Sequence, residues 1–169
     1  MDLPKRKSNR LNNYDYSSPG CYFVTICTHD KQHLLWKNVG SVGADIIRPK
    51  TPRLSRCGRI VEHAIQGIPG HYRNVKLEKY VVMPNHVHLL LRIKEPDGRM
   101  ISAPTKGLPT IVGQMKRVAA KDAGIDLWQK GYHDHVIRND ADYLRIWHYI
   151  DTNPAKWRED CYYCDREEP

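Results

Sequence analysis

The stretch YVVMPNHVHLLL, residues 80–91, restricts the fold of this chain more than any other segment. A Pro-Asn turn signal separates two runs of β-branched and aliphatic residues, which predicts strands at 75–83 and 86–93. Alternate residues of a strand lie on the same face, so His86 and His88 lie side by side. The other alternate positions are apolar and are expected to face a core: Val87, Leu89, Leu91 and Ile93.

Two imidazoles held side by side on a rigid strand can bind one metal ion with little rearrangement. The alternative is the polar face of a half-exposed strand. We favour the ligand pair, because histidine is uncommon and His86 and His88 have this spacing on one strand. His133 and His135 have the same spacing, but Asp134 between them gives no sign of a buried strand. We interpret that second pair as hydrogen-bonding residues, with a metal site as the less favoured alternative.

Apolar spacing and turn signals predict the remaining elements. Strands are expected at 21–28 and 133–137, and helices at 60–68 and 111–124. Asn139 is expected to cap a last helix, which gives the order β-α-β-β-α-β-α. This order favours an α+β fold in which an antiparallel sheet has its helices packed on one face.

The chain has 169 residues, and we expect one domain over 1–169 with a basic N-terminal arm and a short C-terminal tail. Its 27 Lys and Arg against 19 Asp and Glu give a formal charge of +8. This excess favours a polyanionic partner such as nucleic acid, although solubility alone could explain it. No apolar run approaches the ~18 residues of a membrane helix, and the basic start lacks the apolar part of a secretory signal. We therefore expect a cytoplasmic protein.

The last predicted helix carries an apolar stripe with helical spacing: Tyr143, Ile146, Trp147 and Ile150. Tyr149 lies off this stripe, since each residue turns the helix by ~100°. Asn153 lies one turn later on the same flank and closes the helix before Pro154. A phenol and an amide one turn apart can reach the same site. From these residues alone, a surface tyrosine and a helix-ending asparagine are nevertheless the favoured interpretation.

Three segments together resemble one known family. They are VMPNHVHLLL, then WQKGYHDHVIRN, then YLRIWHYIDTNP, and in this order they resemble the REP-associated tyrosine transposases. Those proteins belong to the single-tyrosine HUH endonuclease superfamily, whose name denotes two histidines around a hydrophobic residue. The resemblance runs from about Tyr14 to about Trp157 and implies a ferredoxin-like antiparallel sheet, in agreement with the order of elements read above.

The resemblance also implies roles for individual residues. His86 and His88 match the metal-binding pair of the family, and Tyr149 matches its nucleophile. Asn153 matches the position of a third metal ligand, which is glutamine in related insertion-sequence transposases. The implied cofactor is Mg²⁺ or Mn²⁺. The His-Asp-His segment at 133–135 matches a family segment beside the catalytic helix but outside the metal pair.

The implied activity is cleavage and rejoining of single-stranded DNA beside a hairpin or repeat, through a 5′-phosphotyrosine intermediate. A domesticated or non-catalytic protein that binds DNA hairpins is the alternative. Family members act as monomers or as homodimers, and both states stay open here. Basic side chains on the N-terminal arm and on the second helix are the expected DNA contacts, unless they form solvated faces: Lys5, Arg6, Lys7, Arg10, Lys116, Arg117 and Lys121.

Overall fold

A computed structural model describes residues 11, 13–37, 53–95 and 106–163 of the chain. Its centre is a four-stranded sheet with the order β2-β3-β1-β4. The strands are β1 (Gly20–Cys27), β2 (Val75–Val82), β3 (His86–Ile93) and β4 (His133–Ile137). All three strand pairings are antiparallel. The predicted strands are therefore confirmed to within one residue at each end.

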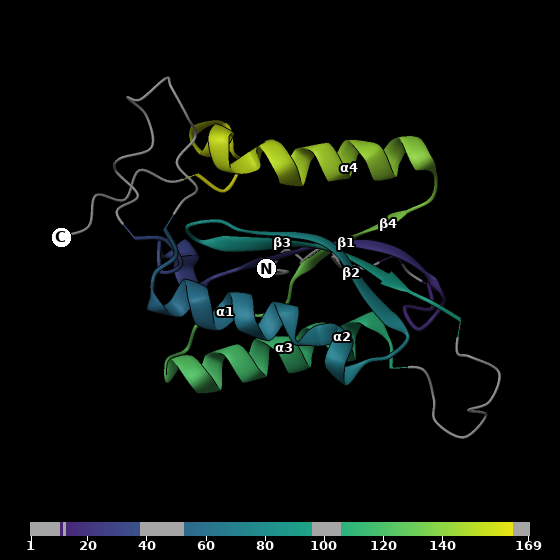
Figure 1. The fold of residues 1–169 in the computed structure, drawn as a ribbon, viewed down its shortest axis with the longest axis horizontal. Coiled ribbons are helices and arrows are strands. Elements are labelled where there is room, and N and C mark those ends of the chain that lie inside the picture. The colour runs from purple at the N-terminus through teal and green to yellow at the C-terminus, as the bar shows by residue number, and fades with distance from the viewer. Residues whose placement is uncertain (1–10, 12, 38–52, 96–105, 164–169) are drawn as a thin grey trace, which may run out of the picture.

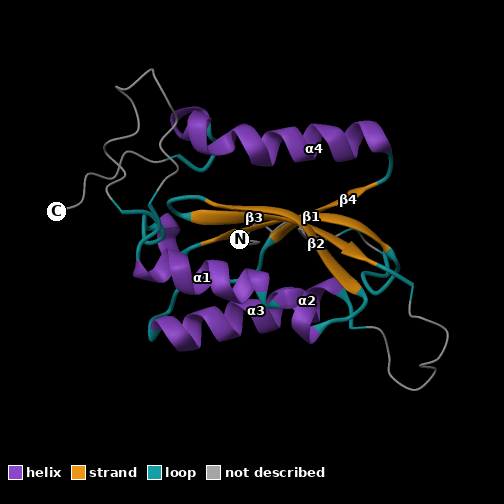
Figure 2. Ribbon diagram, in the orientation of Figure 1, coloured by secondary structure: helices purple, strands orange, loops and turns teal. Residues whose placement is uncertain are grey.

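Three helices cover one face of this sheet, below it in Figure 1, and Figure 2 shows the same layers. They are α1 (Arg56–Gln66), α2 (Ile68–His71) and α3 (Leu108–Ala123). The alternating apolar residues of β3, such as Val87 and Leu89, are fully buried in the core beneath these helices. The first helix, expected at 60–68, begins four residues earlier and ends two residues earlier, and Pro69 and Gly70 lie within the short α2.

The last helix, α4 (Asp140–Thr152), lies on the opposite face of the sheet (Figure 1). The α+β fold and the antiparallel sheet are confirmed, but the expectation that every helix packs on one face is corrected for α4. The reason is that the second sheet face is also partly apolar. Leu90 of β3 and Cys21 of β1 project from it, and Ile146 and Ile150 of α4 bury them.

Two helix ends lie where the sequence predicts them. The side chain of Asn139 caps α4 by accepting a hydrogen bond from the backbone N–H of Asp142 at 2.8 Å. Gly124 ends α3 with a φ of 73°, a left-handed conformation that favours glycine. One residue of the apolar stripe predicted for α4 is not buried. Trp147 is 36% exposed, and Lys79 Nζ lies 4.3 Å from its ring centroid.

After α4 the chain enters a 3-10 helical segment, η3 (Asn153–Glu159), and another, η1 (His29–Lys31), follows β1. Trp157 of η3 is 2% exposed and packs with Trp36 and Met83. The segment after α4 is therefore packed against the same end of the sheet as the β2–β3 turn. Among the described residues, no helix is long and apolar enough to span a bilayer.

Candidate metal and tyrosine site

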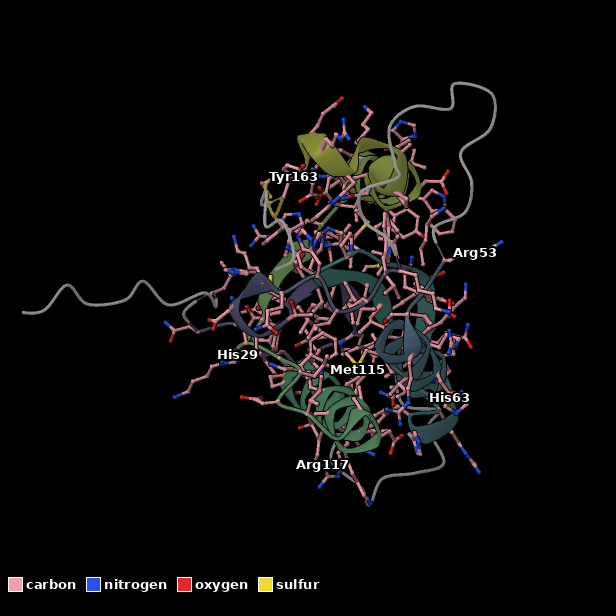
Figure 3. The ribbon with its side chains drawn as sticks, turned by 90° about the vertical axis from the view of Figure 1, so that its left-hand side faces the viewer. His29, Arg53, His63, Met115, Arg117 and Tyr163 are labelled. Carbon is pink, nitrogen blue, oxygen red and sulfur yellow. The ribbon has the colours of Figure 1, made fainter. Side chains whose placement is uncertain are left out.

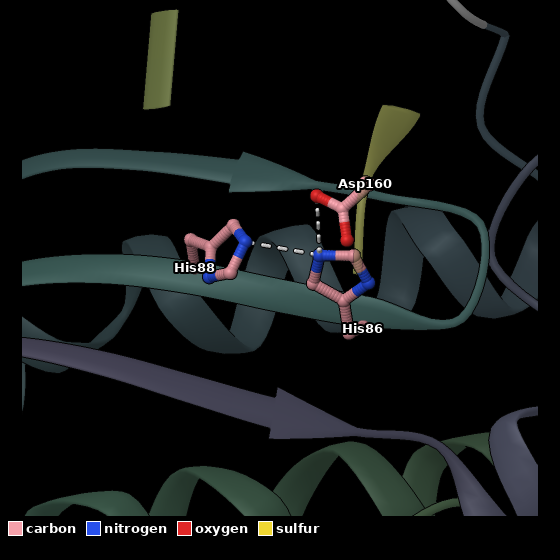
Figure 4. Close-up of side chains that lie close together, drawn as sticks. All are labelled: His86, His88 and Asp160. Carbon is pink, nitrogen blue, oxygen red and sulfur yellow. Dashed lines mark hydrogen bonds and ion pairs between the residues drawn. The ribbon is translucent and has the colours of Figure 1, made fainter. Parts of the chain in front are cut away.

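His86 and His88 project from β3 toward the face that α4 covers. The Nε2 atoms of the two rings lie 3.0 Å apart, and the side chains are 0% and 1% exposed (Figure 4). Phe23 of β1 stacks against the His88 ring, with 5.1 Å between centroids. The prediction from strand alternation that the two imidazoles lie side by side is confirmed. Both rings are buried, whereas a polar strand face would be half exposed.

The hydrogen bonds of the ring Nδ1 atoms orient the Nε2 atoms. Nδ1 of His86 lies 2.8 Å from Oδ1 of Asn85. An amide oxygen only accepts, so Nδ1 of neutral His86 carries the hydrogen and Nε2 presents a lone pair. Nδ1 of His88 lies 2.8 Å from the hydroxyl of Thr25, which can accept in the same way. With both hydrogens on Nδ1, the two Nε2 lone pairs face one point, as they do around a metal ion.

Burial keeps both rings neutral. Desolvation, with a smaller effect of the positive Lys31, lowers the pKa of His86 to about 3. Burial also holds the pKa of His88 well below its usual value, and the neighbouring His86 adds to this effect. A neutral imidazole is the form that binds metal ions, so the environment prepares both side chains as ligands at neutral pH.

Tyr149 and Asp160 complete the cluster. The phenolic oxygen of Tyr149 lies 3.3 Å from Nε2 of His88 and donates to Oδ2 of Asp160 at 3.2 Å. That carboxylate oxygen is 4.0 Å from Nε2 of His86, and the Asp160 side chain is 2% exposed. One ligand atom from each of His86, His88 and Asp160 lies within 4.8 Å of the others, a spacing that fits a shared ion.

The electrostatics of Tyr149 favour its protonated form in this arrangement. Burial raises the pKa of the phenol, and the negative charge of Asp160 raises it further. The hydrogen bond to the carboxylate has the same effect, since it requires the phenolic hydrogen. A cation bound beside Asp160 would reverse this contribution, because it would offset the carboxylate charge.

A surface groove of 330 Å³ leads to Tyr149. Asn153 and Asp160 also line it, and three basic side chains stand along it: Arg145, His148 and Lys156. Asn153 is 3% exposed, and neither its Oδ1 nor its Nδ2 has a hydrogen-bond partner of good geometry among the described residues, although its side chain interacts with the Tyr149 hydroxyl. A buried amide whose hydrogen bonds are not fully satisfied is costly, and a ligand in the groove would relieve that cost.

The donor set fits a divalent cation that accepts both nitrogen and oxygen ligands. Imidazole nitrogens come from β3, a carboxylate oxygen comes from Asp160, and an amide oxygen is available at Asn153. Mixed sites of this kind suit Mn²⁺, and carboxylate and amide oxygens suit Mg²⁺. The structure thus brings together His86, His88 and Tyr149, with Asn153 in the groove beside Tyr149.

Asp160 was not predicted from the sequence, where it lies in the segment read as a short C-terminal tail. The available signal was the aromatic content around it, WREDCYYC, which is unusual for a solvated tail. In the structure, Trp157 is buried, and the Tyr162 ring lies 4.6 Å from the His86 ring. No spacing rule connects such a segment to a strand far back in the chain.

The predicted DNA contacts divide into a group outside the described residues and a group on α3. Those of the N-terminal arm, Lys5, Arg6, Lys7 and Arg10, fall outside the described residues. Arg117 and Lys121 belong to α3, on the sheet face opposite the histidines, and Figure 3 shows Arg117 at the far end of the molecule from Tyr163. Lys116 Nζ donates to the backbone oxygens of Gln129 and Gly131, and burial lowers its pKa. The structure brings none of these three beside the metal pair.

His135 of the second histidine pair takes part in a hydrogen-bond network at the start of α4. Nε2 of His135 lies 2.6 Å from Oδ2 of Asp142, whose other oxygen accepts from Arg145 at 2.6 Å. His135 thus makes the hydrogen bond that we expected of this pair. Arg145 also lines the groove at Tyr149, so the network orients one of its basic side chains.

No family model matches the chain. An uncharacterised protein of Haemophilus influenzae is 33% identical over 178 aligned residues, covering 95% of this chain and 94% of that protein. The chain belongs to the family of this Haemophilus protein. A candidate REP-associated tyrosine transposase of the same organism is 29% identical over 82 residues, which cover 44% of this chain and 47% of that protein.

The fold comparison points the same way. The solved structure of a REP-associated tyrosine transposase bound to a REP hairpin superposes with a TM-score of 0.59. It is 20% identical and covers 88% of this chain and 74% of that one. The resemblance to REP-associated tyrosine transposases that the motifs suggested is therefore confirmed, and the α+β fold is shared.

Proposed function

We propose that this protein is a metal-dependent endonuclease and strand transferase that acts on single-stranded DNA at hairpins or repeats. A transposase-like role in DNA processing fits its relatives, one of which was solved with a REP hairpin. The observation that carries the proposal is the cluster in which the Tyr149 hydroxyl lies 3.3 Å from Nε2 of His88 and 3.2 Å from Asp160. A nucleophile beside a candidate metal site is what this chemistry requires.

His86 and His88 would hold Mg²⁺ or Mn²⁺, with an oxygen ligand from Asn153, as the resemblance implies, or from Asp160. A divalent cation at this position supplies Lewis acidity, which offsets charge on a non-bridging phosphate oxygen. Thr25 and Asn85 orient the two imidazoles through their Nδ1 atoms. Such supporting hydrogen bonds tune metal ligands and are themselves important for affinity.

Tyr149 would act as the nucleophile. Its oxygen forms a bond to the scissile phosphorus, the 3′ oxygen leaves, and the phenolic proton is lost. The products are a 5′-phosphotyrosine and a free 3′-hydroxyl, and a second 3′-hydroxyl can reverse the step to join strands. Because the phosphodiester energy is kept in the covalent bond, no ATP is needed. Asp160 accepts the phenolic hydrogen bond in this structure, so the proton can leave toward its carboxylate.

The DNA would reach Tyr149 through the groove. Arg145 and Lys156 stand along it and can contact phosphates near the scissile bond. We retain Lys5, Arg6, Lys7 and Arg10 as proposed contacts to the substrate. The α3 residues Arg117 and Lys121 could contact only DNA that passes around the sheet to its other face. A monomer or a homodimer, working in the cytoplasm, fits this proposal.

The experiment uses a labelled single-stranded hairpin from the DNA that flanks the gene, with Mn²⁺. We expect the wild type to form a covalent protein–DNA adduct on a denaturing gel. Tyr149→Phe should form none. Tyr143→Phe, a change on the same helix at a ring that lies 5.5 Å from Arg92, should form adduct as the wild type does. Hairpin binding without an adduct in the wild type would favour the alternative, a binding protein without catalysis.

A further inference from the structure

Asn85 occupies the turn between β2 and β3, and hydrogen bonds fix its backbone. It is fully buried, and its backbone oxygen accepts from both the N–H and the hydroxyl of Thr28, at 2.9 and 3.0 Å. On the far side of the turn, Met83 N–H donates to the backbone oxygen of His86 at 2.8 Å. The side chain of Asn85 therefore projects from a well-anchored backbone position directly before His86.

The side-chain amide of Asn85 makes hydrogen bonds to different parts of the chain through its nitrogen and its oxygen. Nδ2 donates to the backbone oxygen of Tyr162 at 2.9 Å and to that of Lys31 at 3.3 Å. Since both partners only accept, the amide has one workable orientation, with Oδ1 toward Nδ1 of His86. One side chain thus sets which nitrogen of His86 carries hydrogen and also ties down the segment at Tyr162.

The segment at Tyr162 carries the third member of the cluster. Oδ1 of Asp160 accepts from the N–H of Tyr162 at 2.7 Å, and the backbone oxygen of Asp160 accepts from Tyr163 N–H at 2.9 Å. These bonds form a turn over residues 160–163 that aims Oδ2 of Asp160 at the site. The side-chain amide of Asn85 joins this turn to the sheet, because its Nδ2 donates to the backbone oxygen of Tyr162.

We propose that Asn85 is a positioning residue that presents Nε2 of His86 and the carboxylate of Asp160 to the same cation. The proposal rests on the metal-dependent function proposed above and deepens it. Both tasks need an amide, because one end must accept and the other must donate. Aspartate keeps the acceptor and lacks the donors, and alanine lacks both.

The test uses Asn85→Asp and Asn85→Ala in the full chain, with Asn139→Asp as the matched amide-to-carboxylate control, because aspartate also caps helices. Long-range proton–nitrogen NMR on metal-free protein reports the tautomer of His86. Hydrogen exchange reports the protection of the amides in the turn at 160–163. Mn²⁺ titration followed by EPR reports metal affinity, and far-UV circular dichroism checks that each variant is folded.

We expect Asn85→Asp to keep hydrogen on Nδ1 of His86 and Asn85→Ala to lose that preference. Both should speed amide exchange at 160–163, and Asn85→Ala should weaken Mn²⁺ binding 10- to 100-fold. Asn139→Asp should change none of these readouts. Unchanged exchange in both variants, or an unchanged tautomer in Asn85→Ala, would overturn the proposal. These two readouts need neither DNA nor metal, so they test the positioning by Asn85 even if no covalent adduct is ever formed. Mn²⁺ binding in Asn85→Ala equal to that of the wild type would overturn the link to the cation.

Discussion

The hydroxyl of Tyr149 lies 3.3 Å from Nε2 of His88, although the two residues are 61 positions apart in the sequence. The contact crosses from α4 to the sheet face that this helix covers, so it depends on α4 lying opposite α1–α3. A second contact, from the same hydroxyl to Asp160 at 3.2 Å, joins the segment after α4 to the cluster. Three parts of the chain thus meet at one phenol.

Replacing the hydroxyl should remove activity with little loss of stability. In Tyr149→Phe the ring keeps its packing against Phe23 and His88, while the hydrogen bond to Asp160 is lost. We expect a free energy of unfolding within about 1–2 kcal/mol of the wild type, as measured by urea titration. A much larger loss would mean that Tyr149 is mainly structural.

His86 and His88 should hold the metal ion, and the second histidine pair, His133 and His135, should not. His88→Ala removes a buried nitrogen from the cluster and should weaken Mn²⁺ binding at least tenfold, as measured by calorimetry. His135→Ala is the matched control, because His135 belongs to the same kind of motif but bonds Asp142 instead. Equal losses in the two variants would contradict this assignment.

The oxygen ligand should be Asp160 more than Asn153. A buried carboxylate brings negative charge to the cation, whereas an amide brings only a dipole, so Asp160→Asn should weaken Mn²⁺ binding more than Asn153→Ala. The comparison also tests the resemblance, which implies the Asn153 position. If Asn153→Ala has the larger effect, the family arrangement holds here and Asp160 serves only the tyrosine.

The metal-free protein should lose stability on acidification. The pKa of His86 is about 3 in the folded chain, against 6.5 for the ordinary side chain, because the ring is buried. The unfolded state therefore binds more protons between these values, and stability falls as pH drops from 6.5 toward 3. This residue alone should contribute up to about 1.4 kcal/mol per pH unit. Urea unfolding at pH 7 and pH 5 measures how the free energy of unfolding depends on pH. His86→Gln should reduce this dependence. If the variant shows the same dependence as the wild type, the burial of His86 is not its cause.

The local features of the site could be predicted because strand and helix geometry is periodic. Alternation placed His86 and His88 together, and helical spacing placed Tyr149 off the stripe of Ile146 and Ile150. The side of the sheet taken by α4 could not be derived, since the chain before Asp140 allows either face. Trp147 was misplaced because the lysine that covers it comes from another element, β2.

The position of Asp160 could not be predicted from the sequence. It lies in an irregular turn, and the hydrogen bonds that aim it come from Tyr162 and, one step further, from Asn85. No period or short motif links an irregular turn to a strand, so its place in the site follows only from the packed fold. The resemblance to a family agreed with the histidine pair and was the source of the proposed roles of Tyr149 as nucleophile and of Asn153 as a metal ligand.

Tyr149 should become covalently linked to the 5′ phosphate of the cleaved strand. The most direct measurement incubates the wild type and Mn²⁺ with a hairpin strand labelled at its 3′ end or at its 5′ end, followed by peptide mass spectrometry of the adduct. We expect only the 3′-labelled fragment to stay on the protein, attached to the peptide containing Tyr149. Retention of the 5′-labelled fragment, or attachment at another residue, would contradict it.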